Sequence, residues 1–338
     1  MSSTPLSILD RANTRLVGGT PVDASTVFGE VTARAQAAER LGYQRFWVAE
    51  HHSVPGIVGS TPTLLLGHLA QNTTSIHLGT GGIMVPSHQP LVIAEQIGTL
   101  QSLYGSRIEI GLGASVGFTK PVRTALRQDA DAKERFTDDV QELVAYLDGT
   151  GPVTAYPQDH SQTQLHILTG GGSALFAAEH GMGLVLGGPE VSRGLAAAQD
   201  RSVAVERYRE HFVPSSQRDQ APHIIASINV AVAETEQAAR DLILSEAWAL
   251  TQSRSTGVFG ALEDPEMIPR DNLSTQQRRR LDSALQTSIY GTPETVVHQL
   301  EAVLEFTQAD EVLVTGNMWD PAAQRASDAL LMHTWQNH

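Results

Sequence analysis

Residues 45–52 read RFWVAEHH, an apolar run that ends abruptly in an acid and two histidines. Short apolar runs are typical of strands buried on both faces, and chemistry in α/β barrels lies where such strands end. Because neighbouring strand residues point to opposite faces, we expect at most one of His51 and His52 to face a central pocket. Histidine is suited to proton transfer near neutral pH. The alternative is that both histidines only make local hydrogen bonds.

Strand-like and helix-like segments alternate on both sides of this run. Helical periodicity over 26–41 ends at Gly42, a residue suited to a helix end. We expect further strands at 6–9, 76–85, 107–113, 165–170, 184–188, 223–232 and 311–316. We expect the intervening helices at 62–71, 90–103, 133–148, 173–180, 190–211, 234–250 and 293–306. The pattern predicts about eight strand–helix units.

Alternating strands and helices imply a parallel sheet with right-handed crossovers, and eight such units close into a (β/α)8 TIM barrel. The whole chain, 1–338, is then a single α/β barrel domain. The competing arrangement is a doubly wound open sheet that binds a dinucleotide. Residues 111–117 read GLGASVG, which spaces its glycines as GxGxxxG and not as the dinucleotide-binding GxGxxG. The sequence therefore favours the barrel.

Composition excludes several functional classes. The formal net charge of −14 disfavours nucleic acid or an anionic membrane as a partner, because both would repel such a surface. The chain has no cysteine, which excludes disulfides, thiolate catalysis and cysteine-ligated zinc. It has no apolar run of the roughly 20 residues that span a bilayer, and MSSTPLSILD does not resemble a signal peptide. We expect a soluble, cytoplasmic protein.

Residues 253–290 interrupt the alternation with a long polar segment before the last strand–helix unit. Connections longer than about 15 residues are usually functional lids or disordered segments. We expect this insertion to be the most mobile part of the chain without ligand, and a candidate lid. The alternative is a partly helical excursion on the surface.

Two glycine-rich segments lie at other strand ends. Gly79, Gly81 and Gly82 fall within a strand, where glycine marks either close approach of a ligand or a bulge that closes the barrel. Residues 169–173 read TGGGS and lead from a strand into a helix, with Ser173 as a plausible N-cap. Free amides at a helix N-terminus bind anions such as phosphate. The alternative is an ordinary capped turn.

A phosphate site, a platform for a flat ligand and a histidine on three strand ends describe an enzyme of flavin mononucleotide (FMN). The chain resembles the bacterial luciferase-like flavin monooxygenases over nearly its full length. The matching segments are RFWVAEHH, LGTGGIMVPSHQPLVIAEQIGTL, RIEIGLG, TGGGSALFAAEHG, YGTPETVVHQL and ADEVLVTGN, in the correct order. The chain looks most similar to the branch found in bacterial secondary-metabolite pathways, including those for aromatic polyketides.

The resemblance implies roles for particular residues. His51 matches the family's catalytic histidine, and Gly81–Gly82 matches a non-proline cis peptide that packs against the flavin, with Thr80 beside it. Arg135 matches an arginine at the start of the long charged helix. The phosphate site matches a run of five residues: Thr169, Gly170, Gly171, Gly172 and Ser173. One departure is Ala114, where luciferases have an arginine, and its loss predicts weaker phosphate binding.

The resemblance also implies the reaction and its partners. A separate flavin reductase would supply reduced FMN, and the enzyme would use it with dioxygen to oxygenate a small organic molecule, for instance an aromatic polyketide intermediate. His51 would act as general acid or base. The insertion would shield the site from water. A homodimer is expected, and no metal is expected at the site.

Three alternatives remain at this stage. Some members of the superfamily use the deazaflavin F420 for hydride transfer without oxygen. A zinc hydrolase could use His51, His52 and His88, but neighbouring strand histidines diverge and the chain has no HxH or HExxH spacing. A non-catalytic flavin-binding relative is the third alternative, and Ala114 is the feature that keeps it open.

Overall fold

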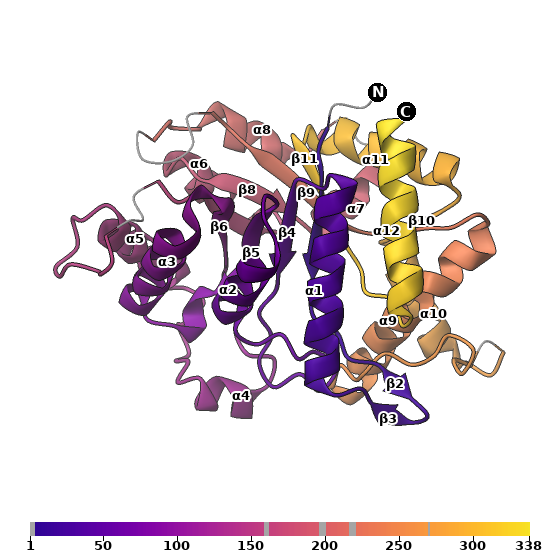
Figure 1. The fold of residues 1–338 in the computed structure, drawn as a ribbon. Helices are drawn as coiled ribbons and strands as arrows, with labels where there is room; N and C mark the ends of the chain where they lie inside the picture. Colours follow the sequence, from indigo (N-terminus) through magenta and orange to yellow (C-terminus); the bar gives the residue numbers. More distant parts are fainter. Residues whose placement is uncertain (1–3, 159–161, 196–200, 216–220, 270) are drawn as a thin grey trace.

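Eight parallel strands close into a barrel in the computed structural model, which describes residues 4–158, 162–195, 201–215, 221–269 and 271–338 (Figure 1). Each strand pairs with the next, and β11 returns to β1 to close the ring. The barrel strands are β1 (Leu6–Asp10), β4 (Arg45–Val48), β5 (His77–Met84), β6 (Ile108–Gly113), β7 (Leu165–Thr169), β8 (Gly183–Leu186), β9 (Ile224–Val232) and β11 (Glu311–Thr315). The predicted (β/α)8 architecture is confirmed.

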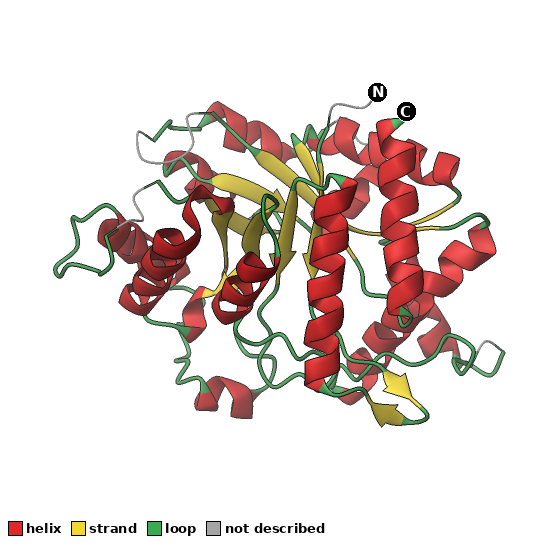
Figure 2. Cartoon of the chain, viewed as in Figure 1, coloured by secondary structure: helices red, strands yellow, loops and turns green. Residues whose placement is uncertain are grey.

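Helices surround the barrel and follow the strands in turn (Figure 2). The outer helices are α1 (Ala24–Leu41), α2 (Pro62–Asn72), α3 (Pro90–Tyr104), α5 (Phe136–Leu147), α6 (Ala174–Glu179), α8 (Val203–Glu210), α11 (Pro293–Thr307) and α12 (Pro321–Gln336). Shorter elements are the hairpin β2 (Leu16–Val17) and β3 (Thr20–Pro21), the helices α4 (Lys120–Ala125) and α7 (Pro189–Ser192), and the 3-10 turns η1 (Val85–Ser87), η2 (Gly105–Arg107) and η3 (Arg193–Leu195). No helix in the described ranges has the length and apolarity that a membrane crossing requires.

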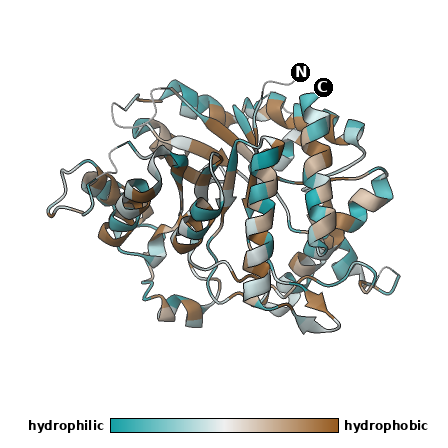
Figure 3. Cartoon of the chain, in the orientation of Figure 1, coloured by the Kyte–Doolittle hydropathy of each residue, from teal (hydrophilic) through white to brown (hydrophobic). Residues whose placement is uncertain are grey.

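Strand alternation divides the core into two parts. Phe46 and Val48 point outward into the layer between barrel and helices, while Trp47 and Ala49 point inward. The interior is filled by these two residues together with Leu9, Val185, Ile225 and Leu313. Strands buried on both sides are mostly apolar, and the helices in Figure 3 are of mixed hydropathy. Arg45 of β4 is a buried exception, and it pairs with Glu109 of β6 and Glu311 of β11. The barrel is therefore a packed core, and a ligand must bind at its mouth.

The insertion expected at 253–290 is packed against the barrel and is partly helical. The helix α9 (Glu236–Thr256) runs six residues beyond the predicted end at 250, and α10 (Thr275–Gln286) begins with a capping box formed by Ser274 and Gln277. The strand β10 (Ile289–Gly291) then pairs with the end of β9. Ile268, Leu281 and Leu285 form a second hydrophobic cluster with Trp248 of α9. The insertion lies between the seventh and eighth barrel strands, as predicted.

The helix predicted at 190–211 is divided in the structure. The elements α7, η3 and α8 occupy its described residues, and 196–200 lie outside them. Ser202 starts α8 as an N-cap, and its hydroxyl also donates to Glu190 at 2.6 Å. A capping residue in mid-segment favours a new helix start over a continuous helix.

Candidate active site

The carboxyl ends of the strands open onto a cavity of about 410 Å³. Leu9 and Arg11 line it from β1 and the residue after it, and polar side chains of the neighbouring strands β11 and β9 line it as well: Thr315, Ser227 and Asn229. Arg254 and Thr287 of the insertion also line this cavity. Active sites of TIM barrels lie at this end, so the cavity is the candidate substrate site.

His51 follows β4 at this mouth and keeps a buried nitrogen without a partner. Its backbone amide donates to the carbonyl of Gly59 at 2.9 Å, whereas its Nδ1 has no hydrogen-bond partner among the described residues. Burial, and then the nearby charge of Arg11, lower the pKa of His51 to about 4. A buried polar atom without a partner is costly unless a ligand satisfies it. His51, the predicted catalytic residue, therefore has a nitrogen available for a hydrogen bond to a bound ligand.

Two residues beside His51 were not identified from the sequence. The ring of Phe118, in the loop after β6, stacks on the imidazole with a centroid separation of 6.2 Å. The guanidinium of Arg11 pairs with the buried carboxylate of Glu246 in α9. The sequence could have indicated them only by position, because Arg11 directly follows β1 and Phe118 lies in the loop after β6. Many other polar and aromatic residues also follow strands, so position alone did not single them out.

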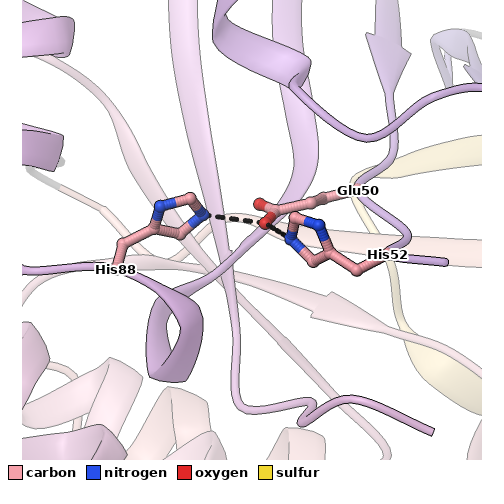
Figure 4. Close-up of side chains that lie close together, drawn as sticks. All are labelled: Glu50, His52 and His88. Atoms are coloured by element: carbon pink, nitrogen blue, oxygen red, sulfur yellow. Dashed lines mark hydrogen bonds and ion pairs between the residues drawn. The ribbon is translucent and has the colours of Figure 1, made fainter. Parts of the chain in front are cut away.

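Glu50 and His52 meet His88 in a cluster that does not include His51 (Figure 4). Oε1 of Glu50 lies 2.5 Å from Nε2 of His52 and 2.7 Å from Nε2 of His88, and Oε2 accepts from the amide of Met84 at 2.9 Å. Burial opposes ionisation of Glu50, but the bonds from both histidines outweigh it and hold the pKa of its carboxyl below the ordinary value. The two neighbouring histidines diverge, as strand alternation predicts.

The three-histidine zinc set considered from the sequence does not form. His52 and His88 lie together, but His51 is outside their cluster and Glu50 takes its place. The physical reason is that Glu50, in the segment after β4, bonds to both His52 and His88, whereas His51 takes no part in these bonds.

The peptide bond between Gly81 and Gly82 is cis, which confirms the prediction. The space beside these glycines is filled by the protein itself. A Cβ at Gly81 would lie 2.5 Å from a methyl of Leu9, and one at Gly82 would lie 2.8 Å from the carbonyl oxygen of Gly111. A Cβ at Gly79 would lie 2.3 Å from the indole of Trp47. Packing within the barrel therefore requires glycine here, and the register of β5 against β6 shifts between Thr80 and Ile83.

The side chain of Thr80 is fully buried and faces β6. Its hydroxyl donates to the carbonyl of Gly111 at 2.8 Å and accepts from the amide of the same residue at 3.0 Å. The hydroxyl replaces the ladder hydrogen bonds that the register shift removes. A cofactor contact from Thr80, predicted from the resemblance, can come only from its backbone.

The turn 169–173 is open on its outer side. Thr169 accepts from the amides of Gly171 at 3.0 Å and Ser173 at 3.2 Å, which orders the turn. Ser173 is the N-cap of α6, as predicted, but its side chain makes no capping hydrogen bond. A Cβ at Gly172 would meet nothing within 4 Å, and Gly170 is exposed. The hydroxyl of Ser173 and the exposed backbone can accommodate an anion.

A cation near this turn comes from a position that the sequence did not indicate. Arg193 of η3 pairs with Glu190 at 2.9 Å, and Glu190 lies next to Gly171, with Oε2 at 3.8 Å from the place a Cβ would occupy. Ala114 brings no charge, so Arg193 is a candidate to supply one. The sequence did not indicate a cation here, because Arg193 lies within the segment 190–211, which was predicted to be one continuous helix.

Arg135 is the N-cap residue of α5 and pairs with two acids of the preceding loop, at 3.4 Å from Asp129 and 3.0 Å from Asp131. The helix α5 reaches the end of α6, since Gln141 of α5 lies 3.2 Å from His180, the C-cap of α6. A role for Arg135 in phosphate binding stays a prediction.

Comparisons with known proteins agree with this architecture. The family model described as luciferase-like monooxygenase matches residues 12–311. A luciferase-like monooxygenase of Escherichia coli K12 is 35% identical over 313 residues, which is 91% of each chain. An N-acetyl-S-alkylcysteine monooxygenase of Bacillus subtilis is 35% identical over 189 residues, covering 53% of this chain and 55% of that protein. The crystal structure of apo-MsnO8 superposes with a TM-score of 0.82 at 27% identity and covers 98% of both chains.

Proposed function

The chain belongs to the luciferase-like monooxygenase family and is a monooxygenase, and from this premise we propose that its cofactor is reduced FMN supplied by a separate flavin reductase. The substrate is then a small organic molecule, for instance an aromatic polyketide intermediate. The observation that carries the proposal is the buried Nδ1 of His51, which has no described partner at the barrel mouth. Arg11, whose charge acts on His51, also lines the cavity of about 410 Å³, which is of the size that small-molecule sites have.

The residues at the mouth fit FMN at two places. The open turn at 169–173, with the guanidinium of Arg193 nearby, would hold the phosphate. The partly exposed backbone of Gly81 and Gly82, with Leu9 and Trp47 beneath it, would support the flat ring. When bound, reduced FMN supplies the electrons that activate dioxygen, which no protein side chain can supply.

The chain itself would contribute three further functions. His51 holds or moves a proton at the mouth, because its imidazole is neutral near pH 7 and has a free nitrogen there. The apolar interior beneath the site, including Leu9 and Leu313, excludes water from below. Arg254 and Thr287 bring the insertion to the cavity, so the insertion is placed to cover it from above.

The test is reductase-coupled turnover of the purified protein with FMN, monitored by oxygen consumption and product mass. We expect His51→Ala to bind FMN with an affinity within about threefold of the parent and to lose about 100- to 10,000-fold of turnover, the usual contribution of a general acid or base. His52→Ala should be milder, since His52 faces Glu50 and not the cavity. Turnover of His51→Ala within threefold of the parent would contradict the assigned role. Oxygen-independent reduction of a substrate with F420 would contradict the choice of cofactor.

Two features support a second copy of this chain as a partner. Leu64 of α2 is 74% exposed, although it is a large apolar residue. It lies at an apolar cavity of about 510 Å³ between α1, α2 and the loop after β4, which Phe28 and Leu65 also line. We expect a homodimer by light scattering, and Leu64→Asp to shift it toward the monomer. Val213→Asp, at another exposed apolar position, is the control. A monomeric parent chain would exclude the homodimer.

A further inference from the structure

Glu50, His52 and His88 are brought together from two loops, and the proposed oxygenation does not use them as a group. They come from the segments that follow β4 and β5, which are neighbours in the barrel. We propose that these three residues form a binding site for a divalent transition-metal ion of the Zn²⁺ type. The proposal is independent of the proposed FMN reaction, because the three residues do not line the candidate cavity and do not include His51.

The donor atoms already converge on one point. Nε2 of His52 and Nε2 of His88 both approach Oε1 of Glu50, at 2.5 Å and 2.7 Å, and the three ligand atoms lie within 4.8 Å of one another. Zinc binds imidazole nitrogen and carboxylate oxygen at about 2.0–2.2 Å, which places tetrahedral donors roughly 3.3 Å apart. Outward shifts of each imidazole by roughly 0.7 Å would therefore open the cluster enough for an ion. Two histidines with one carboxylate form a ligand set that zinc uses in enzymes.

The fold fixes the position of the Glu50 carboxylate. Its side chain is fully buried, and its second oxygen accepts from the amide of Met84 at 2.9 Å. A hydrogen bond to the oxygen that is not the ligand fixes the orientation of a metal-binding carboxylate. Because Glu50 lies only two residues after β4 and is buried there, one corner of the site is held before an ion arrives.

The two histidines provide access and leave room for water. Their side chains are 18% and 28% exposed for His52 and His88, while Glu50 is closed off behind them. Three protein ligands with a solvent-facing side leave an open position, as in sites where the ion also binds water or a small anion. The negative net charge of the chain also attracts cations.

The test is isothermal titration of the full-length, chelator-treated protein with Zn²⁺, and with Co²⁺ for its visible spectrum. We expect one ion per chain, with tetrahedral cobalt absorption. His52→Ala, His88→Ala and Glu50→Gln should each weaken Zn²⁺ binding at least tenfold. His180→Ala and His68→Ala, partly exposed histidines outside the cluster, are matched controls that should leave affinity within twofold.

Circular dichroism of each metal-free variant establishes that it folds, and His88→Gln replaces His88→Ala if the latter does not. Absence of binding by the folded parent protein would overturn the proposal. Binding that persists unchanged in both His52→Ala and His88→Ala would also overturn it, because the ion would then lie elsewhere. The outcome is independent of turnover, so failure of the FMN proposal leaves this measurement interpretable.

Discussion

The imidazole of His51 stacks on the ring of Phe118, with ring centroids 6.2 Å apart and 19° between the planes. Phe118 comes from the loop after β6 and is 68% exposed, so an exposed aromatic covers a mostly buried histidine from the solvent side. We expect this contact to restrict the orientation of the imidazole and the access of water to it.

We therefore expect Phe118→Ala to lower reductase-coupled turnover. A contact between rings contributes about 0.5–1.5 kcal/mol, which corresponds to roughly two- to tenfold in rate. Phe118→Tyr keeps the ring and should retain turnover. Leu103→Ala, at an exposed apolar position on α3, controls for the loss of surface area. Equal turnover of Phe118→Ala and the parent would show that the stacking has no part in the reaction.

Thr80→Val should destabilise the fold while sparing FMN binding. The substitution preserves shape but leaves the amide and carbonyl of Gly111 without the Thr80 hydroxyl, in a fully buried position. Buried groups left without partners cost about 1–3 kcal/mol. Urea denaturation measures the loss, and Thr99→Val on the exposed face of α3 should change stability by less than about 0.5 kcal/mol. Lost FMN affinity in a folded Thr80→Val protein would assign the hydroxyl to the cofactor instead.

Glu39 should make stability depend on pH in the acid range. Burial disfavours its charged form, but hydrogen bonds from the backbone amides of Ser75, Ile76 and Thr74 outweigh burial and lower the pKa of Glu39 from 4.5 to about 2. A lowered folded-state pKa means that the stabilisation is complete above the unfolded value and is lost as pH falls through the folded one.

We expect Glu39→Gln to destabilise the protein at pH 7 by roughly 1 kcal/mol, since solvent screens this partly exposed group. The difference from the parent should shrink between pH 4.5 and about 2. Thermal denaturation at a series of pH values gives this difference, with the exposed Glu305→Gln as control. A difference that does not vary with pH would mean that the amides are not bonded to a carboxylate.

The insertion should respond to ligand through the loop between α9 and α10. The amide of Leu262 donates to the carbonyl of Thr14 at 2.9 Å, and Phe259 accepts from the amide of Gly56 at 3.0 Å. These contacts tie the insertion to the segments that carry Arg11 and His51. Hydrogen exchange at Leu262 and Gly56 should slow on binding of reduced FMN, while exchange in α10 should not change. Identical protection in both states would identify the insertion as a static surface element.

Gly56→Ala is a sharper test of the same contact. Its Cβ would lie 2.0 Å from the carbonyl oxygen of Gly260, so the loop must move away. Deletion of the whole insertion is less informative, because it would also remove Leu281 and Leu285 from the second hydrophobic cluster. We expect Gly56→Ala to release hydrogen peroxide in place of product. Gly29→Ala, where a Cβ meets nothing within 4 Å, is the control. Unchanged coupling in Gly56→Ala would argue against a shielding role.

The fold could be predicted from the sequence because its signals are local. Eight apolar runs, each followed by a helical period, require a parallel sheet, and both faces of that sheet must be covered. Breaks inside segments were less predictable. The extension of α9 to Thr256 depends on packing against Trp248, and the start of α10 at Thr275 depends on a capping box that spans only the four residues 274–277.

The sequence by itself determined the barrel and the position of His51 just after a strand, since apolar runs and helical periods are local. It also predicted that His51 and His52 diverge, although the strand itself ends at Val48. Only the tertiary structure decided what surrounds them. Arg11, His88 and Phe118 follow other strands, β1, β5 and β6, and reach the residues after β4 only when the barrel closes. Likewise, Trp47 and Gly111 occupy the space that Gly79 and Gly82 leave open. Contacts of this kind depend on which strands become neighbours when the barrel closes, and no local pattern of residues records that.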